Sequence, residues 1–169
     1  MKQVYAAFVT LLLLVVPARG GDLPDPNLTP GLIRSGLSLQ QICTNKWGQD
    51  ARHVTDAMKR QIFLSYGLSG NDDRHCVPDA HGRRCEIDHL ISRELGGADD
   101  VKNLWPQPYG THLWNAVLKD RVENRLHKEV CAHRITLKKA QQEIATDWAG
   151  SISPVLWRTI VLAGKRSRP

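Results

Sequence analysis

The sequence predicts a small α+β domain in which two short antiparallel strands and a helix are surrounded by further helices and joined by disulfides. "CEIDHLIS" (85–92) predicts the first strand, because it is a short run with apolar residues between two turn-rich segments. "KNLWPQ" (102–107) predicts a second, because Pro106 and Pro108 exclude a helix there. From Trp114 onward, apolar residues recur at four-residue spacing, which predicts helices.

Residues 1–20 are typical of a secretory signal peptide. Lys2 gives a positive start, "YAAFVTLLLLVV" is a continuous apolar run, and the small residues Ala18 and Gly20 precede the expected cleavage site. An uncleaved membrane anchor is the alternative, but the apolar run is short for a membrane span. We therefore expect a secreted or periplasmic protein with no stable membrane association after cleavage.

The remaining chain divides by composition. Residues 21–36 are rich in proline and glycine, which predicts an exposed leader, and residues 37–150 carry the patterns of one folded domain. Residues 151–169 form a C-terminal segment that ends in a basic tail. The formal charge of +6 includes Lys2 and Arg19, so the chain without its signal peptide carries +4. Such a mild excess permits a polyanionic partner without requiring one.

Three of the expected helices have a start signal. Ser38 is an N-cap candidate for "SLQQIC" (38–43), Thr55 for the helix within 53–67, and Thr136 for the helix within 136–150. Two apolar stripes are expected to face the core: Leu118, Val122, Leu126 and Val130 in one helix, and Leu137, Ala140, Ile144 and Trp148 in the other.

Four cysteines in an exported chain indicate two disulfides. Three pairings exist, and we favour Cys76–Cys85, which closes a small loop, with Cys43–Cys131, which ties the N-terminal part to a later helix. Zinc binding is the competing interpretation, but the chain has no CxxC pair and thiolate ligands suit reducing compartments better.

The segment that suggests chemistry is "CEIDHLISRELGGADDVKNLWPQPY", residues 85–109. His89 titrates near neutral pH, so it can act as a general base. Asp88 offers the hard carboxylate oxygen that binds Mg²⁺ or Mn²⁺. Gly96 and Gly97 predict a turn that returns the second strand beside the first. Asn103 can then reach across to orient His89 or to complete a metal site.

"IDHLISRELGGADDVKNL" resembles the core of HNH endonucleases, and "NLWPQP" followed by Asn115, Ala116, Lys119, Asp120 and Glu123 resembles a group of small exported bacterial HNH-type proteins. The core motif covers about residues 85–125 within the 37–150 domain. The resemblance implies a ββα-metal fold, with Asp-His, a Gly-Gly turn, Asn-Leu, and then a His or Asn that enters a helix.

The resemblance implies a role for each motif residue. His89 is the expected general base, with Asn103 as a second catalytic residue or as a metal ligand beside Asp88. The third letter of the motif is His112 or Asn115, and the pattern of the nearer relatives favours Asn115. Mg²⁺ is the favoured ion, with Mn²⁺, Zn²⁺ and Ni²⁺ as alternatives.

Three cations of the last motif are candidates for phosphate contacts: Lys119, Arg121 and Arg125. The alternative is that they form an ordinary solvated helix face. Trp105 and Trp114 are expected to be core aromatics rather than platforms for stacked bases.

These expectations describe an exported, metal-dependent endonuclease that hydrolyses nucleic acid with little sequence preference, DNA being favoured over RNA. A rival from another class is a non-catalytic exported domain that keeps the fold and binds nucleic acid or serves a structural purpose. A third hypothesis is an antibacterial nuclease toxin, which would have an immunity protein as its partner.

Overall fold

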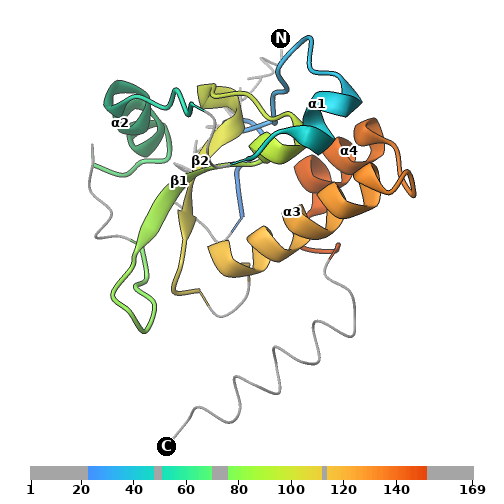
Figure 1. Cartoon of the computed structure of the whole chain (residues 1–169). Helices are drawn as coiled ribbons and strands as arrows, with labels where there is room; N and C mark the ends of the chain where they lie inside the picture. The colour runs from blue at the N-terminus through green and yellow to red at the C-terminus, as the bar shows by residue number, and fades with distance from the viewer. Residues whose placement is uncertain (1–22, 48–50, 70–75, 112–113, 152–169) are drawn as a thin grey trace, which may run out of the picture.

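The computed structural model describes residues 23–47, 51–69, 76–111 and 114–151. In these residues the protein is an α+β fold with a two-stranded antiparallel hairpin and four α-helices (Figure 1). The elements in chain order are α1 (Leu39–Thr44), α2 (Asp56–Ser65), β1 (Cys85–His89), the 3-10 turns η2 (Arg93–Leu95) and η3 (Val101–Asn103), β2 (Leu104–Pro108), α3 (Ala116–Cys131) and α4 (Leu137–Asp147).

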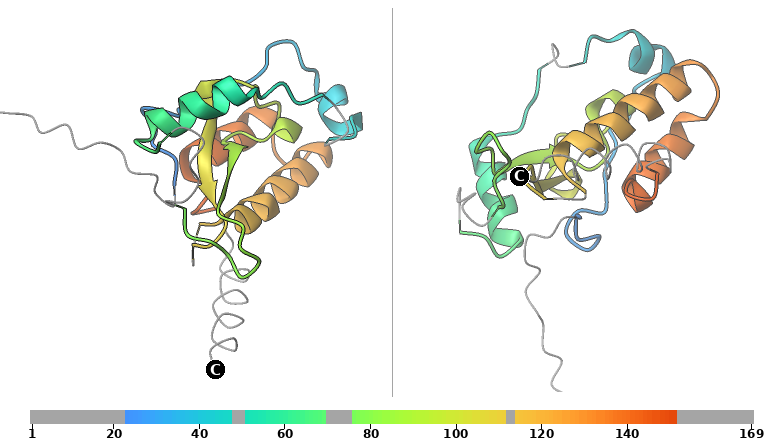
Figure 2. Two further views of the ribbon diagram at one scale, coloured as in Figure 1. Left: turned by 90° about the vertical axis from the view of Figure 1, so that its left-hand side faces the viewer. Right: turned by 90° about the horizontal axis from the view of Figure 1, so that it is seen from below.

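The hairpin lies in the middle of the molecule. Cys85 pairs with Pro108 at one end and His89 with Leu104 at the other, so the two predicted strands are confirmed with slightly shifted bounds. The views agree that α2 lies on one side of the strands and that α3 and α4 lie on the other (Figures 1 and 2). Every residue of β2 is buried as a result, although the strand contains two prolines.

The predicted helix starts are confirmed. The side chains of Ser38, Thr55 and Thr136 accept hydrogen bonds from backbone N–H groups in the first turns of α1, α2 and α4. In α3 the apolar stripe of the sequence is buried, and in α4 the later stripe residues Ala140, Ile144 and Trp148 are buried against it. Four-residue periodicity therefore identified the core faces of both helices correctly.

The connection between the strands differs from the expected glycine turn. It spans residues 90–103 and contains η2 and η3, so the glycine pair lies inside a folded connection. Gly96 ends η2 with φ of 84°. A Cβ on Gly97 would lie 1.7 Å from the backbone oxygen of Ile91 and 2.8 Å from the Asn103 amide nitrogen, so this close approach requires glycine.

The described part of the predicted leader is fixed to the domain, although many of its side chains are exposed. Ile33 forms an isolated bridge with Gly97, and the N–H of Gly31 donates to the carbonyl of Lys102 at 3.0 Å. The Thr29 hydroxyl is buried and donates to the carbonyl of Leu104 at 3.0 Å. Residues 23–36 therefore brace the connection between β1 and β2.

Both expected disulfides are present: Cys43–Cys131 joins α1 to α3, and Cys76–Cys85 closes a short loop before β1. They are consistent with a location outside the cytoplasm. Among the described residues, no helix has the length and apolar character that a membrane crossing needs. The predicted signal peptide and nearly all of the C-terminal segment lie outside the described residues.

Candidate functional site

A cleft of about 400 Å³ opens where β1 ends. It brings together the predicted pair Asp88 and His89 with residues from three other parts of the chain. Its lining consists of Trp47, Arg52, Asp88, His89, Ser92, Arg93, Glu94 and Glu123. A second hollow of about 450 Å³ shares Arg52 with this cleft and runs beside Cys85, Glu86 and Ile87 of β1. Both hollows therefore follow the same strand.

His89 is held by a carboxylate that the motif did not single out. Its Nε2 lies 2.6 Å from Oδ1 of Asp99, and its side chain is only 5% exposed. Asp99 is itself fixed, because its Oδ2 accepts the backbone N–H of His53 at 2.7 Å. With Nε2–H donating to Asp99, the lone pair of the neutral ring lies on Nδ1.

Burial lowers the pKa of His89 below its usual value, and the hydrogen bond to Asp99 offsets this effect only in part. Asp99 shows the reverse balance: burial acts to raise the pKa of its carboxyl, but hydrogen bonds from His53 and His89 outweigh burial and lower that pKa. The pair is therefore a neutral imidazole beside an ionised carboxylate at neutral pH. A neutral imidazole can accept a proton, which a general base must do.

Asp88 takes part in a buried ionic network with α3. Nζ of Lys119 donates to Oδ2 of Asp88 at 2.8 Å, to the backbone oxygen of His89 at 2.5 Å, and to Glu123. The side chain of Lys119 is 0% exposed, while that of Asp88 keeps 24% exposure. Lys119 therefore fixes the end of β1, including the backbone of the predicted base.

The charges of this network shift the pKa values of its members. Burial acts to raise the pKa of Asp88, but the ammonium of Lys119 outweighs it and lowers that pKa. Burial acts to lower the pKa of Lys119, but Asp88 and Glu123 raise it above its usual value. Burial raises the pKa of Glu123 to about 8, against the opposing effect of Lys119. Asp88 and Lys119 are thus a permanently charged pair at neutral pH.

Asn103, a predicted catalytic and metal-binding residue, is buried behind the connection instead of lining the cleft. Its side chain is fully enclosed. Its Oδ1 accepts the N–H of Ile91 at 2.9 Å, and its Nδ2 donates to the carbonyls of Ile91 and Ala98, each at 3.0 Å. The amide therefore holds the start and middle of the connection together.

Asn115, the favoured third motif residue, caps α3. Its Oδ1 accepts the N–H of Leu118 at 3.0 Å, and its Nδ2 donates to the carbonyl of Thr111 at 3.0 Å. It is not among the residues that line the cleft. His112, the alternative, lies outside the described residues, so its role as a metal ligand stays a prediction.

The predicted phosphate contacts need a correction at Lys119. It is enclosed and donates to three acceptors inside the protein, so its ammonium does not face a ligand in the cleft. Arg125 pairs with Glu143 of α4 at 2.8 Å and with Glu129 at 3.3 Å. Arg121 is exposed on α3, and its contact with phosphate stays a prediction.

Two other arginines line the cleft, and the sequence pattern gave no signal for either. Arg52 precedes α2 and donates to the backbone oxygen of Ile87. Arg93 belongs to η2 and donates to the backbone oxygen of Ala51 at 2.8 Å, while its Nε lies 3.8 Å from Asp99. Arg52 is 35 residues from Ile87 in sequence, so only the fold brings it to β1, whereas Arg93 follows the strand closely.

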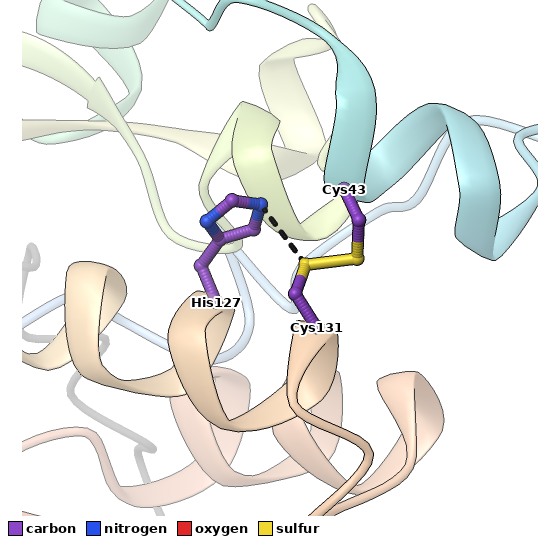
Figure 3. A group of neighbouring side chains, drawn as sticks. All are labelled: Cys43, His127 and Cys131. Atoms are coloured by element: carbon purple, nitrogen blue, oxygen red, sulfur yellow. Dashed lines mark hydrogen bonds between the residues drawn. A yellow bond between two sulfur atoms is a disulfide. The ribbon is translucent and has the colours of Figure 1, made fainter.

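The acidic side chains that line the cleft differ from the predicted ligand set. Asp88, Glu94 and Glu123 line the same cleft, whereas Asn103 and Asn115 use their amides elsewhere. In the described residues, the only three His, Cys, Asp or Glu ligand atoms within 4.8 Å of one another belong to Cys43, His127 and Cys131 (Figure 3). A divalent ion in the cleft would therefore rely on Asp88, with water and one of the neighbouring carboxylates.

No protein-family model, no curated protein and no solved structure matches the chain. The geometry of the cleft therefore carries the functional argument, together with the motif resemblance.

Proposed function

We propose that the protein is an exported HNH-type endonuclease that hydrolyses phosphodiester bonds of nucleic acid with little sequence preference, DNA being the favoured substrate. The observation that carries this proposal is a neutral imidazole, His89, fixed by Asp99 at the edge of a cleft that also contains Asp88. The order strand, long connection, strand and helix supports the proposed ββα-metal core, because Asp88 and His89 end its first strand and Asn115 begins its helix.

In the proposed reaction, His89 takes a proton from water through Nδ1, and the water oxygen attacks phosphorus in line with the leaving 3′ oxygen. The new P–O bond forms as the bond to that oxygen breaks, so the products carry a 5′ phosphate and a 3′ hydroxyl. The proton that reaches the 3′ oxygen comes from solvent. Asp99 stabilises the imidazolium that His89 becomes.

Arg52 and Arg93 would bind the scissile or neighbouring phosphates, because both line the cleft beside His89. The second hollow, which shares Arg52, offers a path for the rest of the strand along β1. A bound Mg²⁺ near Asp88 would supply charge stabilisation for the phosphate and the leaving oxygen, and Mn²⁺, Zn²⁺ or Ni²⁺ are alternatives. Since most contacts would be made to phosphates, we expect cleavage to weaken as the salt concentration rises.

The test is cleavage of plasmid DNA, single-stranded DNA and RNA by the purified oxidised protein with each of these four cations. We expect cleavage with at least one cation, and we expect His89→Ala to reduce it roughly a hundredfold to ten-thousandfold. His81→Ala is the matched control, because His81 is exposed and lies in the loop before β1. Intact substrates with every cation, or full activity of His89→Ala, would contradict the proposal. Binding without cleavage would favour the non-catalytic rival.

A further inference from the structure

The Cys43–Cys131 disulfide lies against a histidine that the proposed reaction does not use. His127 and Cys131 lie one turn apart on α3, and Cys43 reaches them from α1 (Figure 3). Nε2 of His127 is 3.5 Å from Sγ of Cys131. The three ligand atoms all lie within 4.8 Å of one another, a closeness unmatched by other groups of His, Cys, Asp or Glu in the described chain.

We propose that Cys43, Cys131 and His127 form a zinc site when this disulfide is reduced. The same residues would then join α1 to α3 in two ways: through a sulfur–sulfur bond in the oxidised protein and through Zn²⁺ in the reduced one. Two thiolates and one imidazole are ligands that zinc favours, and a fourth position would remain for water. This inference does not depend on the proposed nuclease activity.

The chemistry requires a reductant, and a dithiol of the thioredoxin type is the class we expect in a cell. Its first thiolate attacks one sulfur of the disulfide, and its second thiol releases the mixed disulfide. The S–S bond breaks, the reductant gains an S–S bond, and two protons pass from the reductant to Cys43 and Cys131. Binding of Zn²⁺ then displaces these two protons.

The distance between Nε2 of His127 and Sγ of Cys131 is already close to the distance between two ligands of a zinc ion. With Zn–S of about 2.3 Å and Zn–N of about 2.0 Å, a nitrogen and a sulfur ligand in tetrahedral geometry lie about 3.5 Å apart. The observed distance from His127 Nε2 to Cys131 Sγ is 3.5 Å. The two sulfur atoms, which are bonded in the oxidised protein, must separate to about 3.8 Å in the same geometry. Cysteine side-chain rotation and a small shift of the short helix α1 can provide this separation.

A carboxylate on the far side of the ring would support the tautomer that binds metal once zinc takes Nε2. Nε2 of His127 lies 3.0 Å from the backbone oxygen of Ile42, so this nitrogen carries the proton in the oxidised protein. Zinc would take Nε2, and the proton would move to Nδ1, which lies 3.9 Å from Oε2 of Glu94. Carboxylate, histidine and zinc in series are a common arrangement, because the carboxylate fixes the ring and increases its basicity.

The group formed by Cys43, His127 and Cys131 is partly exposed to solvent. The side chain of His127 is 21% exposed, and both cysteines are partly exposed. The Cys76–Cys85 disulfide offers a control within the same chain, because in the described residues no third ligand of these types completes a group with it. The two disulfides should therefore respond differently to zinc after reduction.

The experiment uses the secreted chain with Cys76→Ser and Cys85→Ser, so that only the proposed pair remains. The protein is reduced with a water-soluble phosphine, which takes an oxygen atom from water as the disulfide becomes two thiols. Zn²⁺ is then titrated by calorimetry, and Co²⁺ is used as a spectroscopic probe of thiolate ligation. Because a divalent ion is also proposed for the cleft, the oxidised protein is titrated first as the baseline. We expect one additional ion per chain after reduction, with about two protons released for that ion and thiolate ligation only in the reduced protein.

Three further variants identify the ligands. Cys43→Ser with Cys131→Ser, which keeps the other cysteine pair, should lose the thiolate–cobalt signal. His127→Gln should weaken zinc binding at least tenfold, and Glu94→Gln about tenfold through the orientation of the ring.

Circular dichroism separates a missing site from a missing fold. A reduced protein that loses helix and regains it with one Zn²⁺ would support the proposal as strongly as binding to a folded chain. The proposal would be overturned by a reduced protein that binds no ion, by one that stays unfolded when zinc is added, or by binding that His127→Gln leaves unchanged.

Discussion

Opposing influences act on the pKa of His89. Burial lowers this pKa most, with a smaller contribution from the charge of Arg52, while the hydrogen bond to Asp99 and the charge of Asp88 raise it by less. The proposed base is therefore neutral at neutral pH and becomes protonated only in more acidic solution. Cleavage should then fall as the pH drops through the pKa of His89, which lies below the usual value for histidine.

Asp99→Asn tests this assignment. Because the carboxylate of Asp99 raises the pKa of His89, its removal should lower that pKa and move the acidic limb of the pH–rate profile to lower pH. The rate at neutral pH should also fall, since a weaker base accepts a proton less readily. Asp100→Asn is the neighbouring control and should leave the limb in place. If the acidic limb of the pH–rate profile did not shift in Asp99→Asn, His89 would not be the group whose protonation limits cleavage.

Lys119→Met tests the buried network. The change leaves Asp88 and Glu123 without their shared cation, so we expect the free energy of unfolding to fall by about 3–5 kcal/mol. Urea unfolding measures the loss, and Lys128→Met, which changes an exposed lysine of the same helix, should alter it little. Equal stability of the two variants would show that Asp88 and Glu123 do not need Lys119.

At the scale of elements, the connection between β1 and β2 decides where the site lies. It carries Arg93 to the cleft and Asp99 to the ring of His89, and the Asn103 amide ties it together through three backbone partners. The described N-terminal segment pairs with its outer side through Ile33 and Gly97. The base is thus positioned by a braced connection as well as by the strand that contains it.

We therefore expect the main effect of Asn103→Ala to be a lower stability of the fold. It leaves the buried N–H of Ile91 and two carbonyls without partners, which should lower the free energy of unfolding by about 3 kcal/mol, since each orphaned group costs roughly 1–3 kcal/mol. Thermal unfolding of the variant and of Asn124→Ala, which is exposed on α3, gives the comparison. A variant as stable as the control, but defective in metal binding, would restore Asn103 as a ligand.

The elements themselves were largely predictable, because they depend on local signals. Patterns among neighbouring residues are enough to predict the two strands, the apolar stripe of α3 and the caps at Ser38, Thr55 and Thr136. The residues that line the cleft were not predictable from the sequence, except for Asp88 and His89. Arg52 contacts β1 from 35 residues away, and the pairing of Asp99 with His89 across ten residues depends on how the connection folds. A lysine such as Lys119 looks in sequence like any solvated helix residue. Lys119 was expected on the surface, but its ammonium is buried inside the protein.

At the scale of the whole molecule, the two disulfides differ in the length of chain that they close. Cys43–Cys131 spans 88 residues and Cys76–Cys85 spans 9. If a disulfide stabilises by restricting the unfolded chain, replacement of the first pair by serine should cost about 4–5 kcal/mol and of the second about 2–3 kcal/mol. Denaturant unfolding of the two double variants tests the order. A larger loss from the short loop would show that strain or local packing dominates.

The long disulfide also has a consequence for the survival of the protein when a protease cuts it. The two strands, the braced connection and all of α3 up to its last residue lie between Cys43 and Cys131. A single cut anywhere in that span, such as in the exposed loop before β1, opens a peptide bond but leaves both pieces covalently attached. A nicked molecule should run as one species on a gel without reductant and as two fragments with it, and its halves of the cleft should remain together.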